Sequence, residues 1–402
     1  HALPAVEFAD PELSSASGLV VYQGLFQRLG LRSRLQACFG VEAWSPSFSS
    51  ARVVLLLVVH LILGYQRLRE TKYYRDDPMV LRVLGLRRLP DVSTVSRRLR
   101  KMDAASCGRV RALVGDLVVD RLREEGLRRV TLDFDGTVLA TRRHGEGTAI
   151  GFNRKRKGTR SYYPLLCTVA QTGQVLDVLH RSGNVNDYKG ALPFITGCVE
   201  RVQGELGVRV EARMDAAVYS HEALERLEQM KVEYSVSVPY GASPPLRQVI
   251  EGRQRWRRID ETWSYFEVVW CSRKMTRKRR YVVYRKWVPT RERGPLQLDL
   301  YEPVSWDYQY RVVVTNKRVH AAQLLQFHNG RGAQEGVIGE IKDLCQARYI
   351  PTRSWVGNQM YLQAGLLAHN LTRELQMQVQ PRDRERSAQQ TALWKFEKIS
   401  TI

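Results

Sequence analysis

Two acidic residues interrupt an apolar, β-branched stretch at residues 129–140, and the pattern predicts a buried strand over 129–141. Side chains alternate between the two faces of a strand, so Asp133 and Asp135 point to the same side. Two carboxylates buried side by side are costly unless a cation separates them, they ionise differently, or they lie at the exposed end of the strand. The pair therefore indicates a charged site, or acids at a strand end that lead into a turn at Gly136.

A third acid follows another predicted strand. Apolar side chains alternate over residues 208–214, which predicts a strand over 207–215, and Ser220 is a suitable N-cap for a helix over 220–230. Asp215 would then lie just past the carboxyl end of a strand, where the functional sites of open α/β sheets gather. An isolated acid in this place can equally serve as a turn or cap residue.

Residues 328–342 carry charges at a helical spacing. If the segment is a helix of 3.6 residues per turn, Arg331, Glu335 and Lys342 project from one face, with the carboxylate between two cations. A solvated stripe of i,i+4 ion pairs has the same pattern. Together with the two strand acids, this pattern favours a catalytic site over a solvated surface stripe.

Three separated carboxylates suit metal-assisted cleavage of a phosphodiester. The reaction aligns a water or a 3′-hydroxyl opposite the leaving oxygen and neutralises charge on both, which two divalent metals about 3.5–4 Å apart can do. Carboxylate oxygens are good ligands for Mg²⁺. The six cysteines show no Cys-x2-Cys spacing, so the sequence indicates neither a zinc site nor a disulfide framework.

The expected elements follow the order of an RNase H fold, with the acids on the first strand, after the fourth strand and on a late helix. The Gln171–Gln174 stretch would join the second and third strands as a hairpin. The expected elements are strands over 129–141, 161–170 and 174–181, a helix over 189–204, a strand over 207–215, a helix over 220–230, a strand over 232–238 and a helix over 333–346.

These segments resemble the DDE transposases of bacterial insertion sequences. One class of that family carries a Tyr-x2-Arg-x3-Glu-x6-Lys signature, and this chain keeps the spacing with His in place of Tyr, as His328, Arg331, Glu335 and Lys342. Asp-Gly-Thr at 135–137 matches the family's first acid.

Other segments carry the same resemblance. Arg-x-Asp at 213–215 matches the second acid of the family. Short motifs at residues 163–166, 183–186 and 368–371 also resemble the family, and they point to the thirteen-eighty branch of insertion sequences. The resemblance covers about residues 128–378. The three segments that contain the acids match the family with high specificity, and the other segments match it with low specificity.

The resemblance implies an enzyme that binds insertion-sequence end DNA, cleaves phosphodiester bonds and joins 3′-hydroxyl ends to target DNA. Asp135, Asp215 and Glu335 would be both catalytic and metal-binding, with Mg²⁺ as the cofactor and Mn²⁺ as a substitute. The partners would be double-stranded transposon-end and target DNA, bound by a homodimer. The expected location is the bacterial cytoplasm at the nucleoid, with no membrane partner.

The implied fold is an α/β protein in which a β-rich insertion interrupts an RNase H-like catalytic domain. The expected parts are a helical N-terminal DNA-binding region at 1–120, the catalytic domain at 121–237 and 317–378, the insertion at 238–316, and a basic C-terminal tail at 379–402.

The charge balance agrees with a nucleic-acid partner. Lys and Arg number 63 against 41 Asp and Glu, which gives a formal net charge of +22. Basic runs at 153–160, 253–258 and 273–280 could contact a phosphate backbone, although such runs are often only solvated loops. Alongside His328, Arg331 and Lys342, the first of these runs supplies the DNA-contact candidates Arg154, Lys155, Arg156 and Lys157.

The sequence pattern of the first 120 residues predicts helices. The apolar block at 53–63 is too short to span a bilayer, so it predicts a buried helix, and we expect neither a signal peptide nor a transmembrane segment. Residues 78–101 predict a short helix, a turn and a second, basic helix capped near Asp91 or Ser93. This pair is either a helix-turn-helix with Arg97 and Arg98 facing DNA, or an ordinary amphipathic helix pair.

The interval of 120 residues between Asp215 and Glu335 is longer than the fold needs. Its β-type runs at 264–270, 280–288 and 308–315 predict the insertion. In the resembled family such an insertion lies by the active site and can supply an aromatic ring that stacks on a flipped base. Trp306 is the first candidate for that ring, and core packing is its alternative role.

Two other functions compete with this interpretation. The run Asp133 to Thr137 also matches the opening motif of haloacid-dehalogenase-type phosphatases, in which the first Asp is a nucleophile. The pair of metal-holding acids that those enzymes need further along the chain is missing, because the single Asp-Asp lies upstream at Asp76 and Asp77. A non-catalytic, DNA-binding domesticated transposase is the other alternative, and the three intact acids argue against it.

Overall fold

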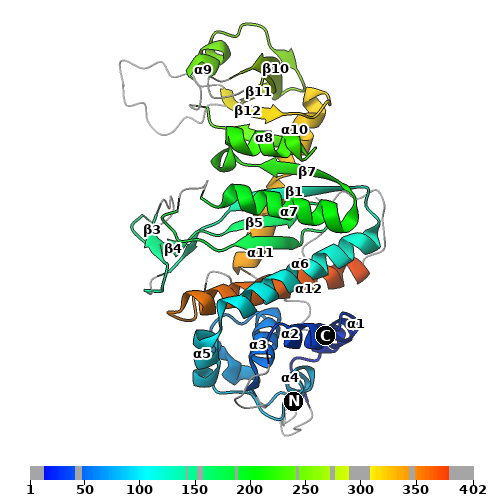
Figure 1. Cartoon of the computed structure of the whole chain (residues 1–402), viewed down its shortest axis with the longest axis vertical. Coiled ribbons are helices and arrows are strands. Elements are labelled where there is room, and N and C mark those ends of the chain that lie inside the picture. Colours follow the sequence, from blue (N-terminus) through cyan, green and yellow to red (C-terminus); the bar gives the residue numbers. More distant parts are fainter. Residues whose placement is uncertain are drawn as a thin grey trace, which may run out of the picture. The chain divides into compact units, whose positions relative to one another are not determined.

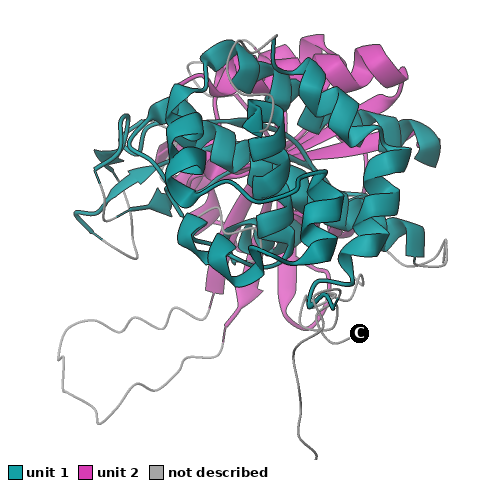
Figure 2. Ribbon diagram, turned by 90° about the horizontal axis from the view of Figure 1, so that it is seen from below, with its two compact units in different colours: residues 1–126, 136–185, 333–402 teal, residues 127–135, 186–332 magenta. Residues whose placement is uncertain are grey.

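The computed structural model describes residues 13–40, 48–141, 144–151, 157–185, 189–240, 244–271, 277–288, 308–343 and 349–379. The chain divides into two compact units, which Figure 2 colours separately. Unit 1 comprises residues 1–126, 136–185 and 333–402, and unit 2 comprises residues 127–135 and 186–332. Element labels below are those of Figure 1.

The regular elements described in the N-terminal part of unit 1 are helices. In α3, every residue but Arg52 is buried, which is typical of a core helix. Ser49 caps α3 by accepting a hydrogen bond from the Arg52 amide. The elements are α1 (Leu19–Arg28), α2 (Leu31–Ala37), α3 (Ser50–Ile62), the 3₁₀ helix η2 (Leu68–Tyr74), α4 (Pro78–Leu84), α5 (Val92–Lys101) and α6 (Ala104–Glu125).

The long C-terminal helix α12 (Trp355–Val379) is the centre of unit 1 and packs against α3, α5 and α6. A buried ion pair joins two of these helices, because Arg121 Nε on α6 donates to Glu374 Oε2 on α12 at 2.7 Å. Asn370 on α12 satisfies the backbone of an edge strand, since its amide exchanges two 2.8 Å hydrogen bonds with the peptide of Val175.

Unit 1 also contains two small strand groups. The hairpin β5 (Leu165–Val169) and β6 (Val175–Leu179) is antiparallel, with Gly173 at φ 67° in its turn, as predicted. A second sheet has the order β2 (Leu139–Ala140), β4 (Arg160–Tyr162) and β3 (Ala149–Ile150). The late helix α11 (Gly332–Asp343) continues unit 1 from residue 333 onwards.

Two predicted strands are shorter in the structure. The strand expected over 161–170 is two strands, because Pro164 between β4 and β5 cannot donate to a ladder. The strand expected over 129–141 ends at Gly136, and β2 is separate from it. Gly136 leaves no room for a side chain, since a Cβ there would lie 2.6 Å from the Tyr163 hydroxyl.

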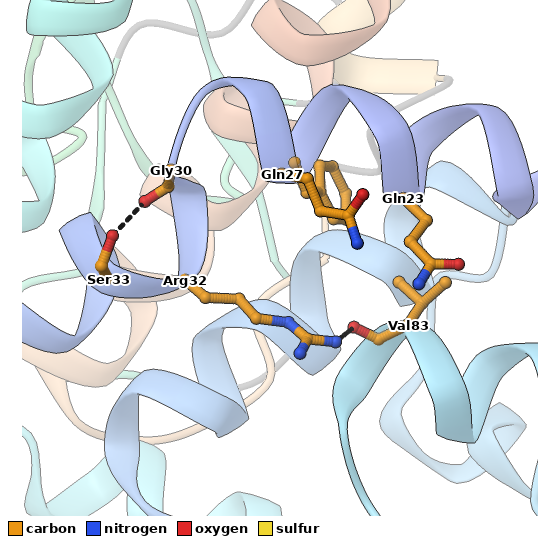
Figure 3. A pocket seen from close by; sticks show the side chains of 7 residues that line it. Gln23, Gln27, Gly30, Arg32, Ser33 and Val83 are labelled. Carbon is orange, nitrogen blue, oxygen red and sulfur yellow. Dashed lines mark hydrogen bonds between the residues drawn. The ribbon is translucent and has the colours of Figure 1, made fainter.

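A shallow pocket among the first helices of unit 1 is shown in Figure 3. The guanidinium of Arg32 donates to the carbonyls of Arg82, at 3.1 Å, and Val83 in the last turn of α4. A cation at a helix C-terminus is favourable because the carbonyl ends carry partial negative charge. The residues that line the pocket are Gln23, Phe26, Gln27, Gly30, Arg32, Ser33 and Val83. Arg32 therefore caps the C-terminal end of α4.

Unit 2 is built on a twisted sheet with the order β1-β7-β8-β12-β11-β10-β9. The first three strands are parallel and the others antiparallel. The strands are β1 (Arg129–Gly136), β7 (Arg209–Met214), β8 (Glu233–Val238), β9 (Arg257–Arg258), β10 (Trp263–Trp270), β11 (Arg279–Trp287) and β12 (Tyr308–Thr315). The helices are α7 (Ala191–Leu206), the 3₁₀ helix η3 (Ala216–Val218), α8 (His221–Gln229), α9 (Pro244–Glu251) and α10 (Ala321–Asn329).

The strands β10, β11 and β12 lie close to the runs expected for the β-rich insertion at 238–316. They do not form a sheet of their own, because β12 pairs with β8 and so extends the sheet that carries β1 and β7. The helix α10 packs on one face of this extension, against Tyr265, Tyr284 and Val313.

No helix in the described part of the chain combines the length and the apolar character needed to cross a bilayer.

A buried histidine in unit 1 allows a test of pH dependence. The His180 ring lies 4.4 Å from the rings of both Tyr162 and Trp355, and neither of its nitrogens has a hydrogen-bond partner among the described residues. Burial lowers the pKa of His180 to about 4. In the unfolded chain the His180 ring becomes protonated as the pH falls below about 6.5, whereas in the folded chain it becomes protonated only near pH 4. The free energy of unfolding therefore falls as the pH drops from 6.5 to 4, because protonation favours the unfolded chain in this range.

Replacing His180 by Phe should therefore weaken the acid dependence of folding. Between pH 7 and 5 we expect the variant to lose about 2 kcal/mol less unfolding free energy than the parent, since one pKa unit corresponds to about 1.4 kcal/mol. Urea denaturation at the two pH values measures this difference. An equal loss in both proteins would show that folding does not lower the pKa of His180.

Candidate active site

Asp133 and Arg213 form a buried ion pair in the middle of the parallel part of the unit 2 sheet. They are register partners on β1 and β7, and Arg213 donates from Nε to Asp133 Oδ1 at 2.5 Å and from Nη2 to Oδ2 at 2.6 Å. Asp133 is only 1% exposed. Burial raises the pKa of Asp133, and the guanidinium of Arg213 opposes that shift.

Arg213 also reaches the helix that covers this face of the sheet. Its Nη1 donates to the Phe327 carbonyl on α10 at 2.9 Å, and its guanidinium lies 5.3 Å from the centre of the Phe327 ring. A Cβ on Gly330 would come within 2.2 Å of the same Nη1, so the chain passes close to Arg213 only because residue 330 is glycine. Arg213 thus links β1, β7 and the end of α10.

Asp135 lies two residues beyond Asp133 on β1, and Asp215 lies two residues beyond Arg213, directly after the end of β7. Since β1 and β7 are parallel and Phe134 pairs with Met214, both acids follow at the carboxyl edge of the sheet. Phe134 packs edge-on against Phe194 of α7, so by alternation Asp133 and Asp135 face the opposite side, as predicted. The side chains of Asp135 and Asp215 are 21% and 40% exposed, which leaves both carboxylates accessible.

Asp215 also begins the segment that leaves the sheet. It is the N-cap of η3, and its Oδ1 accepts a hydrogen bond from the Ala216 amide at 2.7 Å. Ser220 caps α8 through a 3.0 Å bond from the Ala223 amide, as the sequence predicted. The cap fixes Oδ1 of Asp215, which is also the oxygen that Arg331 approaches.

Arg331 joins the two accessible acids. Its Nη1 lies 3.8 Å from Asp135 Oδ2, and its Nη2 lies 3.7 Å from Asp215 Oδ1. The sequence placed Arg331 on one helical face with Glu335 and Lys342, but α10 ends at Asn329 and α11 begins at Gly332. Arg331 lies in the turn between these helices, where its amide donates to the His328 carbonyl at 3.1 Å, and its side chain points to the strand acids.

His328, an expected DNA contact, is buried in the structure. His328 is 3% exposed, and its Nδ1 and Nε2 are hydrogen-bonded to the hydroxyls of Ser235 and Ser237 at 2.7 and 2.9 Å. Burial, helped by nearby arginines, lowers the pKa of His328 to about 3, so the ring is neutral. It therefore anchors the end of α10 to β8.

Glu335 and Lys342 lie in unit 1, in the first and last turns of α11. Glu335 is exposed and Lys342 is half-buried. Within the residues that the structure describes, no three His, Cys, Asp or Glu side chains lie close enough together to hold a metal ion. The structure thus brings together Asp135 and Asp215, with Arg331 between them, and places Glu335 in the other unit.

The pair of acids fits a divalent cation by its donor chemistry. Asp135 and Asp215 supply accessible carboxylate oxygens, the ligand type that Mg²⁺ prefers. The guanidinium of Arg331 already occupies the space near both carboxylates, which shows that this edge of the sheet accommodates positive charge.

The structure describes some of the other candidate DNA contacts. Arg97 is exposed and Arg98 half-exposed on α5, whose apolar side buries Val95 and Leu99. Lys157 is exposed. The remaining candidates, Arg154, Lys155, Arg156 and Trp306, and nearly all of the basic tail at 379–402, lie outside the described residues.

One aromatic and cationic cluster on the antiparallel part of the sheet was not singled out from the sequence. The guanidinium of Arg285 lies 4.4 Å from the ring centres of both Trp256 and Tyr308, which are themselves half-exposed. The signal was a basic run at 253–258 with a tryptophan inside it, next to a strand carrying another arginine.

The phosphatase alternative does not agree with this geometry. Its nucleophile would be Asp133, but that carboxylate is buried and both of its oxygens accept hydrogen bonds from Arg213. A carboxylate held in this way has no free oxygen to attack a phosphoryl group.

Comparisons with known proteins gave matches to transposases. The sequence model of one family, described as transposase DDE domain group 1, matches residues 5–399. The piggyBac transposase in a synaptic complex with hairpin DNA is 11% identical, with 96% of this chain and 78% of that chain covered and a TM-score of 0.49. A comparison with curated protein sequences gave no match.

The Mos1 transposase is similar over about half of the chain. Its paired-end complex with the left transposon end is 15% identical, with 52% of this chain and 63% of that chain covered and a TM-score of 0.19. Since the family match spans almost the whole sequence, the chain belongs to the transposase DDE domain family, group 1.

Proposed function

We propose that this DDE transposase cleaves DNA at the ends of its own insertion sequence and joins the 3′-hydroxyl ends to target DNA, with Asp135, Asp215 and Glu335 as the catalytic acids. The observation that carries the proposal is the pair Asp135 and Asp215, accessible at the carboxyl ends of neighbouring parallel strands and within 4 Å of one shared cationic side chain. The signature spacing adds Glu335 as the third acid.

In this proposal the acids hold Mg²⁺, or Mn²⁺ in its place. Divalent ions bound there would promote deprotonation of the attacking water or 3′-hydroxyl and neutralise charge on the leaving oxygen. The protein's own contribution is position: the ladder between β1 and β7 fixes the spacing of the first two acids, and the buried pair of Asp133 and Arg213 beneath them fixes the strands.

The catalytic core is proposed to be RNase H-like, made of the β5–β6 hairpin, the parallel strands β1, β7 and β8, and the helices α7, α8 and α11. The segment 238–316 then acts as an insertion that extends this sheet. Its cluster of Arg285, Trp256 and Tyr308 combines stacking surfaces with positive charge, which suits DNA bases and phosphates.

The DNA contacts proposed for the rest of the chain follow its positive charge. The basic α5, with Arg97 and Arg98, would bind end DNA, and Lys157 with its basic neighbours would contact the backbone. We propose a homodimer on paired ends and a bacterial insertion sequence of the thirteen-eighty type as the source. A net charge of +22 makes attraction to duplex DNA strong in any of these arrangements.

The roles of the signature residues can be separated by salt-dependent DNA binding. Lys342→Ala and Arg331→Ala should each weaken cleavage and reduce the log–log salt slope of end binding by roughly 0.9, the value of one phosphate contact. Glu335→Gln should remove cleavage and leave the slope unchanged, because a carboxylate contributes no phosphate contact. Anisotropy titrations with labelled end DNA across a salt series provide the slopes.

Two results would contradict these roles. An unchanged slope in both cation variants would show that neither Arg331 nor Lys342 contacts a DNA phosphate. Cleavage by the Glu335→Gln variant at the parental rate would remove Glu335 from the site, and binding without any cleavage by the parent protein would favour a non-catalytic DNA-binding role.

A further inference from the structure

Arg331 contacts both accessible acids by charge without the geometry of a close hydrogen bond. Its two nitrogens lie 3.8 Å from Asp135 and 3.7 Å from Asp215, beyond the roughly 3.2 Å limit of a good N–H···O bond. The attraction is therefore mainly coulombic, and the guanidinium can leave both carboxylates without breaking short hydrogen bonds to them.

The backbone of Arg331 is fixed more firmly than its side chain. Its amide donates to the carbonyl of His328, whose ring is held by two serine hydroxyls of β8. The preceding Gly330 lies against the buried guanidinium of Arg213. A long side chain on a fixed turn can change partner by rotation about its own bonds.

We propose that Arg331 is the resident counter-ion of the Asp135–Asp215 pair in the DNA-free protein, and that it yields this place to a divalent cation when a DNA phosphate takes over its guanidinium. The inference rests on the proposed function, because it assigns the order in which that site is filled. Metal binding is then coupled to DNA binding, and a protein without DNA binds metal weakly.

The physical reason is competition for the same negative charge. A guanidinium near both carboxylates neutralises part of the charge that would attract a divalent ion and repels that ion directly. A phosphate is a better partner for the guanidinium than either acid at its present distance, since it accepts two parallel hydrogen bonds. By linkage, a metal that gains affinity when DNA is bound must raise DNA affinity by the same factor.

The first test is a titration of the DNA-free protein with Mn²⁺, with free Mn²⁺ measured by electron paramagnetic resonance. Arg331→Gln should bind Mn²⁺ about tenfold or more tightly than the parent, because a competing unit charge is gone. Arg331→Lys keeps the charge and should stay near the parent. Arg209→Gln removes an equal charge from an exposed position at the start of β7 and should also stay near the parent.

A second substitution tests where the more tightly bound Mn²⁺ lies. Adding Asp215→Asn to Arg331→Gln should abolish the gain, whereas a gain that survives would place the ion elsewhere and overturn the proposal. Circular dichroism of each variant verifies that it is folded. Equal Mn²⁺ affinities in the parent and in a folded Arg331→Gln variant would also overturn it.

The coupling is tested by anisotropy with a fluorescein-labelled duplex of arbitrary sequence, with and without Mn²⁺. Mn²⁺ should strengthen binding by the parent and do so much less in Arg331→Gln, and an equal gain in both would refute the exchange of partners. These outcomes do not depend on cleavage. A protein that shows this pattern but never cuts DNA would keep the counter-ion role of Arg331 and lose the proposed transposase reaction.

Discussion

Asp135→Asn and Asp215→Asn should each abolish DNA cleavage and, in the absence of divalent metal, leave duplex binding close to that of the parent. Both carboxylates are accessible at the carboxyl edge of the β1–β7 ladder, and an amide there cannot supply the negative charge needed to bind a divalent ion. Losing charge stabilisation at the reacting centre should lower the rate by a factor on the order of 10³ or more. A nicking assay on a supercoiled plasmid carrying the element's ends measures the rate, and anisotropy measures binding.

The matched control is Asp76→Asn, which makes the same chemical change at an exposed position of unit 1. It should cleave at the parental rate. Cleavage retained by Asp135→Asn or by Asp215→Asn would remove that residue from the catalytic set, and loss of DNA binding in either would show that the acid acts through the fold instead.

The parts of this structure that depend on local chemistry could be predicted from the sequence. Ser220 caps α8 because a hydroxyl before an apolar helical pattern has a nearby amide to bind. The common side of Asp133 and Asp135 follows from strand alternation, and α3 is buried because it is apolar all round.

The site itself depends on pairing between distant segments, which no local pattern records. The sequence contains Arg213 next to Asp215, but only the parallel register of β1 and β7 places Arg213 opposite Asp133. Two acids two residues apart therefore have different roles: Asp133 is a buried structural partner and Asp135 is accessible.

The signature segment shows the same limit. A helical spacing predicted that Arg331 shares a face with Glu335, but glycines at 330 and 332 flank a break between α10 and α11, and the turn directs Arg331 to the strand acids. His328 matched a DNA-contacting position by spacing alone. Its burial follows from two serines on β8, a strand about 90 residues earlier in the chain.

Arg213→Ala should destabilise the protein by about 3–5 kcal/mol, the usual result of leaving one partner of a buried ion pair without its counter-charge. Asp133 would remain 1% exposed with no guanidinium, and the Phe327 carbonyl would lose its donor. Urea denaturation at neutral pH measures the loss. Because Arg213 lies on β7, just before Asp215, and its ion pair joins β7 to β1, which carries Asp135, the folded fraction of the variant should also cleave more slowly.

The double variant Asp133→Leu/Arg213→Met separates the ion pair from general packing. Replacing both charges by apolar groups removes the uncompensated carboxylate, so the double variant should regain most of the stability lost by Arg213→Ala. The unpaired Phe327 carbonyl should keep it about 1–3 kcal/mol below the parent. If the double variant is no more stable than Arg213→Ala, the loss comes from packing around the guanidinium, and the buried charge of Asp133 is not what makes Arg213 necessary.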